Sequence, residues 1–202
     1  MILLTCAVGK ELGFFRSAPG VEMLVTGVGP IEAAAAVSRA LAQSSYSYVI
    51  NAGIAGAFEG CAQVGDGVVV AEELMPMGLE TGAAFALPDG AAVVERVSSD
   101  LAMVDRLVER GFASKRGLTV SQVTATEGTA QRLAALGVEV ESMEGFAVLR
   151  AAEIAGVAAV EVRGISNIVT ARERSRWDFS AGTTGLENIL NALLSTLTAL
   201  DG

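Results

Sequence analysis

Short apolar runs alternate with amphipathic segments along most of the chain, and this alternation restricts the fold more than any other feature. The apolar runs predict strands at residues 2–8, 21–26, 48–51, 68–71, 117–123, 136–140 and 157–165. A spacing of three and four between apolar residues predicts helices at 30–43, 98–109, within 124–136, at 144–154 and at 181–200. Strands and helices in alternation are typical of a sheet covered by helices. We therefore predict an α/β fold of three layers, α/β/α, with a twisted, mixed and mostly parallel sheet, and place all 202 residues in one domain.

The charge of the chain excludes several classes of partner. Its formal net charge is −9, and it has no basic run or basic amphipathic helix, so neither nucleic acid nor an acidic membrane surface is expected. No apolar run reaches the roughly 18 residues that span a bilayer, and the first residues do not resemble a signal peptide. We expect a cytoplasmic protein that binds a small molecule.

The chain contains no histidine, which removes the usual general base and the usual metal ligand. Its two cysteines, Cys6 and Cys61, lie far apart and match neither a disulfide framework nor a zinc motif. We expect no metal and no organic cofactor. If the protein is an enzyme, carboxylates and amides must carry its chemistry.

Two glutamates follow predicted strands, where ligands gather in open α/β sheets. Glu144 stands in Glu-Ser-Met-Glu-Gly, residues 141–145, at a strand-to-helix turn, where a carboxylate can accept hydrogen bonds from two sugar hydroxyls. The alternative is a plain first-turn glutamate with Ser142 as the N-cap. Glu11 follows the first strand, and the alternative for it is a solvated loop position.

A Gly/Ala segment, residues 51–57, follows the third predicted strand. Its backbone N–H groups are open to close approach by a ligand, and Ala55 and Gly56 are candidate substrate contacts. The segment lacks the Gly-x-Gly-x-x-Gly spacing of dinucleotide sites. A tight crossing of backbone in a crowded sheet remains the alternative. Residues 72–89 are expected to be rich in loops.

Five segments, taken together, resemble the nucleoside phosphorylase and nucleosidase superfamily. They are Val-Thr-Gly-Val-Gly-Pro at 25–30, Ile-Asn-Ala-Gly-Ile-Ala-Gly at 50–56, Val-Gly-Asp at 64–66, Glu-Ser-Met-Glu at 141–144 and Val-Arg-Gly-Ile-Ser-Asn at 162–167. Within that superfamily the chain is most similar to the futalosine hydrolase family, chiefly through Arg-Gly-Ile-Ser-Asn and the later Arg-Ser-Arg-Trp-Asp-Phe. This resemblance implies hydrolysis of the N-glycosidic bond of futalosine in menaquinone biosynthesis, with release of hypoxanthine and dehypoxanthine futalosine.

The resemblance also implies roles for individual residues. Glu144, preceded by Met143, matches the glutamate that binds the ribose 2′-hydroxyl and stabilises an oxocarbenium-like sugar. Glu11 matches the glutamate that positions and deprotonates the attacking water. Arg163 matches an arginine that organises the water and the acidic groups, and Ser166 matches a support for the base-binding side chain.

Asn167 stands where the adenine-cleaving relatives have aspartate. A protonated aspartate donates to purine N7 and accepts from the 6-amino group of adenine. The amide of asparagine can instead donate to N7 and to a 6-oxo oxygen, so Asn167 indicates hypoxanthine as the leaving group. The alternative is an asparagine that merely caps a turn.

Water is the expected nucleophile. No Lys or Arg occurs between Arg39 and Arg96, where phosphorylases of the superfamily carry an arginine for phosphate. Ile54 also replaces the serine that adenosine-type nucleosidases have after the glycine, which makes this wall of the pocket more apolar.

The base is expected in the groove of residues 123–126, with Thr126 as a contact. Because Ala125 replaces the aromatic stacking residue of the family, Phe146 and Phe179 are the candidates to stack on the base. For the 5′ substituent the candidates are Arg172, Arg174 or Arg176 as a cation, with Trp177 and Phe179 against a ring. Each of these arginines is alternatively part of a solvated loop. Relatives are commonly dimers or larger, so a homo-oligomer is expected.

Three other functions stay open on the sequence. One is a phosphorylase that transfers the ribosyl group to phosphate. Another is an adenine nucleosidase for methylthioadenosine or adenosylhomocysteine, which Asn167 disfavours. The third is a nucleoside-binding module without catalysis, which the presence of both Glu11 and Glu144 disfavours.

Overall fold

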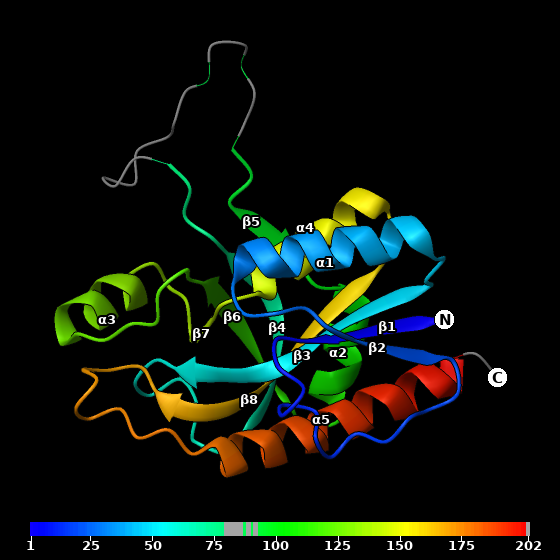
Figure 1. Cartoon of the computed structure of the whole chain (residues 1–202). Coiled ribbons are helices and arrows are strands. Elements are labelled where there is room, and N and C mark those ends of the chain that lie inside the picture. Colours follow the sequence, from blue (N-terminus) through cyan, green and yellow to red (C-terminus); the bar gives the residue numbers. More distant parts are fainter. Residues whose placement is uncertain (79–86, 88–89, 91–92, 201–202) are drawn as a thin grey trace.

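The computed structural model describes residues 1–78, 87, 90 and 93–200, and shows a mixed eight-stranded sheet flanked by helices (Figure 1). Parallel pairings join β1 to β2, β1 to β3, β3 to β8, β4 to β6 and β6 to β7, while β3–β7, β4–β5 and β4–β8 are antiparallel. The predicted α/β class with a mixed, mostly parallel sheet is therefore confirmed. In chain order the elements are β1 (Ile2–Cys6), β2 (Val21–Val25), α1 (Pro30–Gln43), β3 (Tyr48–Ala57), β4 (Gly67–Leu74), β5 (Arg96–Ser98), α2 (Leu101–Glu109), β6 (Ala113–Thr119), α3 (Glu127–Ala134), β7 (Val140–Ser142), α4 (Gly145–Ala155), β8 (Ala159–Ile168) and α5 (Phe179–Leu200).

The central strands close into a ring. β8 pairs with β3 and β4, while β7 and β6 connect the same two strands on the other side. The ring interior is filled by small and branched apolar side chains, as expected for a narrow closed sheet. These are Ala55, Ala57, Val68, Val70, Val140 and Ile165. Strands β1 and β2 extend the sheet from β3, and β5 extends it from β4.

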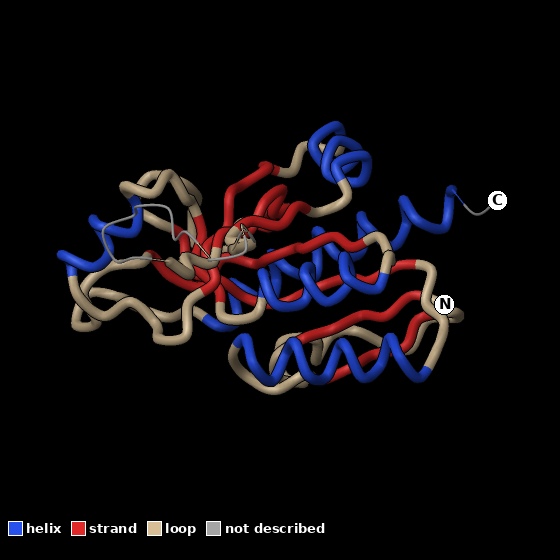
Figure 2. Tube along the Cα trace, turned by 90° about the horizontal axis from the view of Figure 1, so that it is seen from above, coloured by secondary structure: helices blue, strands red, loops and turns tan. Residues whose placement is uncertain are grey.

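Helices cover the sheet in two groups. The helix α5 lies along β8 and β4 together with α2, and the apolar core between them includes Leu107, Leu186 and Leu190. On the other face α1 packs against α4 over a core that includes Val37 and Val148. The start of β1 and the end of α5 lie at the same end of the molecule in the two views (Figures 1 and 2). Within the described residues, no helix combines the length and the apolar composition needed to cross a membrane.

The Gly/Ala segment is part of a strand and not a loop after one. β3 runs from Tyr48 to Ala57, pairing along its length with β8, so the segment is a close crossing in a crowded sheet. Its glycines admit neighbouring side chains. A Cβ on Gly53 would lie 2.4 Å from Arg163 Nη1, and one on Gly56 would lie 3.0 Å from Asn167 Nδ2. The absent side chains thus make room for two of the predicted site residues.

Several predicted boundaries are wrong. The helix α2 begins at Leu101 with Asp100 as its N-cap, because the Asp100 side chain accepts from Ala102 N while Ser98 belongs to β5. The strand β6 is Ala113–Thr119 and not 117–123, and β7 is Val140–Ser142 and not 136–140. Of the expected loop at 72–89, the first residues lie in β4, and 79–86 and 88–89 lie outside the described residues.

Candidate active site

A cavity of about 200 Å³ opens where the carboxyl ends of several strands meet. The turn after β1 brings Glu11 to the cavity, and β3 and β8 contribute residues to its wall. Strand β7, which runs antiparallel to β3, contributes Glu141 and Ser142. The lining residues are Ala7, Val8, Glu11, Val28, Ile54, Ala55, Gly56, Val123, Glu141, Ser142, Met143, Glu144, Ser166, Asn167 and Trp177. The structure therefore brings together Glu11, Glu144, Asn167, Met143, Ser166, Ala55 and Gly56, which the sequence placed in one site.

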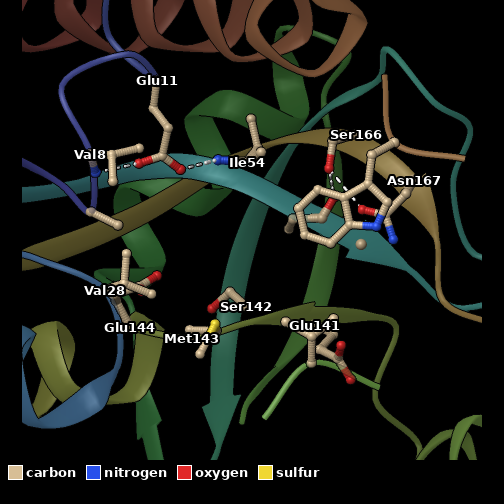
Figure 3. Close-up of a pocket in the computed structure, with 15 residues that line it drawn as sticks. Val8, Glu11, Val28, Ile54, Glu141, Ser142, Met143, Glu144, Ser166 and Asn167 are labelled. Carbon is tan, nitrogen blue, oxygen red and sulfur yellow. Dashed lines mark hydrogen bonds between the residues drawn. The ribbon is translucent and has the colours of Figure 1, made fainter. Parts of the chain in front are cut away.

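Glu11 is buried, with 4% of its surface exposed, which rules out a solvated loop position. Its Oε2 accepts a hydrogen bond from Val8 N at 3.0 Å, and its Oε1 accepts one from Ile54 N at 3.0 Å (Figure 3). Two backbone donors, one in the turn after β1 and one in β3, thus hold the carboxylate in one orientation. Each oxygen keeps a second lone pair, so the group can still accept a proton or a hydrogen bond from a ligand.

Glu144 is the N-cap residue of α4, yet its side chain does not cap that helix. Its Oε1 instead accepts from Gly29 N at 2.8 Å, at the N-terminus of α1, where the helix dipole favours a negative charge. Burial raises the pKa of Glu144, although Arg163 and the Gly29 N–H partly offset that rise. The carboxylate reaches across to another helix, so it is not a plain first-turn residue.

Ser166 and Asn167 are neighbouring residues of β8, at the other end of the pocket from Glu11 and Glu144 (Figure 3). The Ser166 hydroxyl lies 2.8 Å from Asn167 Oδ1 and donates to it, which leaves Nδ2 as the free end of the amide. That Nδ2 makes only long contacts, 3.4 Å to Ser175 Oγ and 3.5 Å to Ile168 O. Asn167 lies inside a strand and caps no turn, so its amide is available to donate to a ligand.

Arg163 lies behind the cavity and does not line it. Its Nε donates to Glu161 Oε1 at 2.7 Å and its Nη2 donates to Ser142 Oγ at 3.3 Å. Burial lowers the pKa of Arg163, but the attraction of Glu161, Glu144 and Glu11 outweighs burial and raises it overall. Arg163 therefore stays charged, and its charge attracts Glu144 and Glu11 from behind the cavity.

Three predicted contacts lie away from the cavity. Thr126 caps α3, because its hydroxyl accepts from Thr129 N. Phe146 is buried between α4 and α1 and faces a different groove, so it cannot stack on a base in this pocket. Phe179, the first residue of α5, is partly exposed and does not line the cavity. The aromatic side chain that does line it, among the described residues, is Trp177, with Arg172 stacked 5.2 Å from its ring centroid.

Glu141 also lines the pocket, although no role for it was predicted from the sequence. Its carboxylate accepts from Thr124 N at 3.1 Å and from the Thr124 hydroxyl, and burial raises its pKa against those two bonds. It thereby fastens the loop after β6 to the end of β7. The sequence does carry a signal for Glu141. It is a glutamate that alternates with apolar residues at the end of a buried strand.

The walls carry acidic and apolar groups without a balancing cation. Of the described residues that line the cavity, none is lysine or arginine. The described part of the chain also brings together no group of three or more His, Cys, Asp or Glu side chains able to hold a metal ion. The site thus combines three glutamates, Glu11, Glu141 and Glu144, with the amide of Asn167.

Comparison with known proteins defines the class. The model of the Phosphorylase superfamily matches residues 13–199. Two solved structures share the fold. One is a 5′-methylthioadenosine/S-adenosylhomocysteine nucleosidase from S. pneumoniae with a transition-state inhibitor, at TM-score 0.79 and 19% identity over 97% of this chain and 99% of that one. The other, a putative nucleosidase of the same kind from Borrelia burgdorferi bound to adenine, has TM-score 0.80 and 18% identity over 97% and 100%. The chain belongs to the phosphorylase superfamily.

Closer relatives define the family within it. A futalosine hydrolase from Acidothermus cellulolyticus is 38% identical over 193 residues, 88% of this chain and 77% of the relative. The Streptomyces coelicolor futalosine hydrolase is 34% identical over 197 residues, 90% and 82% of the two chains, and that of Thermus thermophilus is 31% identical over 185 residues, 87% and 82%. The chain is a member of the futalosine hydrolase family, as the sequence motifs indicate.

Proposed function

We propose that this protein hydrolyses the N-glycosidic bond of futalosine, releasing hypoxanthine and dehypoxanthine futalosine. One observation carries the proposal. A single cavity holds two oriented carboxylates, Glu11 and Glu144, at one end and the free amide end of Asn167 at the other (Figure 3). Similarity to three futalosine hydrolases along most of the chain supports the choice of substrate.

The two carboxylates have different roles in this mechanism. Glu144 accepts hydrogen bonds from the ribose hydroxyls, and its charge stabilises the oxocarbenium-like sugar as the bond to the base breaks. Glu11, held by Val8 N and Ile54 N, orients a water on the other face of the sugar and takes its proton. Arg163 stabilises both negative charges from behind the pocket.

Asn167 selects and activates the leaving group. With Oδ1 held by Ser166, its Nδ2 donates to purine N7 and to the 6-oxo oxygen. Charge that develops on the departing base is thereby stabilised. An adenine nucleosidase is the second candidate, favoured by the fold neighbours, but its substrate presents a 6-amino donor that an Nδ2 donor cannot match. Trp177 is the aromatic wall available to the base or the 5′ substituent.

Water is the nucleophile in this proposal. A phosphate dianion needs cationic or multiple backbone donors, and the described lining of the cavity contains neither Lys nor Arg. Ile54 contributes an apolar wall where phosphate would otherwise be held.

The homo-oligomer also remains a proposal. Ile31 on α1 and Ile154 on α4 are 80% and 71% exposed and border one apolar groove, a surface suited to a second copy of the chain. Light scattering during size exclusion measures the oligomeric state, and a monomer at micromolar concentration contradicts it. The cytoplasmic location and the single domain likewise stay predictions.

A product assay tests the activity. Purified protein is offered futalosine, inosine and methylthioadenosine, each with and without phosphate, and the released base is identified by chromatography. We expect hypoxanthine from futalosine at a rate independent of phosphate. Strict dependence on phosphate indicates a phosphorylase, release of adenine alone indicates the adenine nucleosidase, and binding of futalosine without turnover indicates a binding module.

A further inference from the structure

Two buried glutamates, Glu73 and Glu161, lie behind the pocket and have no role in the mechanism proposed above. Glu73 on β4 and Glu161 on β8 are both 0% exposed. Glu161 and Arg163 are two residues apart on β8, so their side chains lie on the same face of the strand and form a buried ion pair. Burying carboxylates is costly unless each oxygen is paired.

One oxygen of each glutamate has no hydrogen-bond partner: Glu73 Oε1 and Glu161 Oε2. Both oxygens face the same point, the space left by Gly145. A Cβ on Gly145 would lie 2.5 Å from Glu73 Oε1 and 2.6 Å from Glu161 Oε2. Two unpaired, charged oxygens at one buried point would repel each other, whereas a single proton between them satisfies both.

The hydrogen bonds around Glu73 assign that proton to one atom. Thr119 Oγ1 accepts from Phe146 N at 2.8 Å, so its own hydroxyl proton is free to point to Glu73 Oε2, at 2.7 Å. Glu73 Oε2 is therefore an acceptor, and the proton belongs on Oε1. On the partner, Glu161 Oε1 accepts from Arg163 Nε, so this oxygen does not hold the proton and Oε2 is left as the acceptor for Glu73.

Electrostatics agrees with this assignment. Burial, reinforced by the negative charge of Glu161, raises the pKa of Glu73 well above its usual range. The charged groups around the pair are Arg163 on β8, which acts on both glutamates, and Glu144 at the start of α4, which acts on Glu161, while Glu11 after β1 acts on Arg163 and Glu144. Among them only Arg163 is a cation, so a neutral Glu73 lessens the excess of negative charge.

We propose that Glu73 is a neutral carboxylic acid that donates a hydrogen bond to Glu161, and that this acid–carboxylate pair positions Arg163 behind Glu11 and Glu144. Because Glu161 balances the positive charge of Arg163, the guanidinium orients the two pocket carboxylates without neutralising their negative charges. Their negative charge stays available to a cationic transition state. The catalytic consequence rests on the proposed hydrolysis, but the shared proton is a property of the protein alone.

Glu73→Gln and Glu161→Gln test the proposal, with Glu153→Gln as the matched control, since Glu153 is an exposed partner of Arg150 on α4. In the infrared spectrum of wild-type protein at neutral pH we expect the C=O stretch of one protonated carboxyl group, lost in Glu73→Gln and kept in Glu153→Gln. Absence of that band, or its survival in Glu73→Gln, overturns the proposal. This measurement needs no substrate, so it is independent of the assay for futalosine hydrolysis.

Kinetics tests the positioning role. The amide N–H of Glu73→Gln replaces the shared proton, so kcat/KM falls by less than about tenfold and the acid limb of the pH profile stays in place. Glu161→Gln leaves Arg163 without its carboxylate, so the guanidinium turns to Glu144. We then expect kcat/KM to fall on the order of 100-fold and the acid limb to move to lower pH. Glu161→Asp should restore part of the loss.

Equal losses in Glu73→Gln and Glu161→Gln, or an acid limb that stays in place in Glu161→Gln, overturn the positioning role. Circular dichroism confirms that each variant is folded. If Glu161→Gln does not fold, Glu161→Asp provides the kinetic comparison and the infrared spectra of wild type and Glu73→Gln still decide the position of the proton.

Discussion

Glu144 joins two helices that are far apart in the sequence. It begins α4, while its carboxylate accepts the N–H of Gly29 at the start of α1. Gly29 has φ +96°, a conformation that favours glycine and that aims this N–H at the pocket. The position of the carboxylate therefore depends on the backbone of a loop that lies 115 residues earlier in the chain.

Glu144→Gln tests the role of that charge. The amide is nearly the same shape, but it removes the negative charge that stabilises the oxocarbenium-like sugar. We expect kcat/KM on futalosine to fall by about 10² to 10³ with the fold intact. Hypoxanthine release and circular dichroism measure the two effects, and Glu153→Gln is the control. Normal turnover by Glu144→Gln would show that the central assignment is wrong.

Asn167→Asp tests selection of the base. A protonated aspartate in the same place donates to N7 and accepts from a 6-amino group, so the ratio of kcat/KM for adenine nucleosides over futalosine should rise by about tenfold or more. Competition between futalosine and methylthioadenosine measures that ratio. An unchanged ratio would mean that another residue reads position 6 of the purine.

The sequence located much of this site but not all of it. Glu11, Glu144 and Asn167 follow or end strands in recognisable motifs, so their meeting at one edge of the sheet was predictable. The sequence did not reveal that Phe146 turns into the core, because the direction of a helical side chain depends on which face the helix buries. Nor did it reveal Glu141, whose partner Thr124 lies 17 residues earlier.

At the scale of the elements, the strand β8 explains how the site is held. It pairs with β3 on one side and β4 on the other, and it carries Glu161, Arg163, Ser166 and Asn167. Apolar periodicity predicted most helices and strands, since that signal is local. Closure of the sheet through β8 depends on pairing between distant strands, for which a single sequence carries no direct signal.

Gly164→Ala tests the contact between β8 and α5. A Cβ on Gly164 would lie 1.9 Å from Gly182 O and 2.6 Å from Leu186 N, both backbone atoms that cannot rotate away. We expect the free energy of unfolding to fall by about 2 to 4 kcal/mol, with loss of activity because Asn167 lies on the displaced strand.

Gly128→Ala is the matched control for that substitution. Gly128 lies in α3, and a Cβ there would meet no atom within 4 Å. Alanine favours a helix over glycine, so this variant should gain about 0.5 to 1 kcal/mol. Urea unfolding followed by circular dichroism measures both. Equal effects in the two variants would contradict backbone contact between α5 and β8.

At the scale of the whole molecule, the buried acids tie stability to pH. Burial raises the pKa of Glu73, Glu141 and Glu144 in the folded state. A group with a raised folded pKa contributes stability that is fully present below its unfolded pKa, near 4.5, and that is lost as pH rises through the folded pKa. Each such group therefore lowers the free energy of unfolding above that pH.

Glu73→Gln should reduce this loss, because it removes the acid whose pKa is raised well above its usual value. A single group contributes a slope of at most about 1.4 kcal/mol per pH unit between its unfolded and folded pKa. We expect wild-type stability minus that of Glu73→Gln to decrease steadily as pH rises from about 4.5 toward neutrality. Urea unfolding at a series of pH values gives this difference, in which the titration of other groups cancels. A difference that grows with pH would mean that Glu73 is ionised in the folded protein, and the buried pair would then carry two negative charges against the single cation of Arg163.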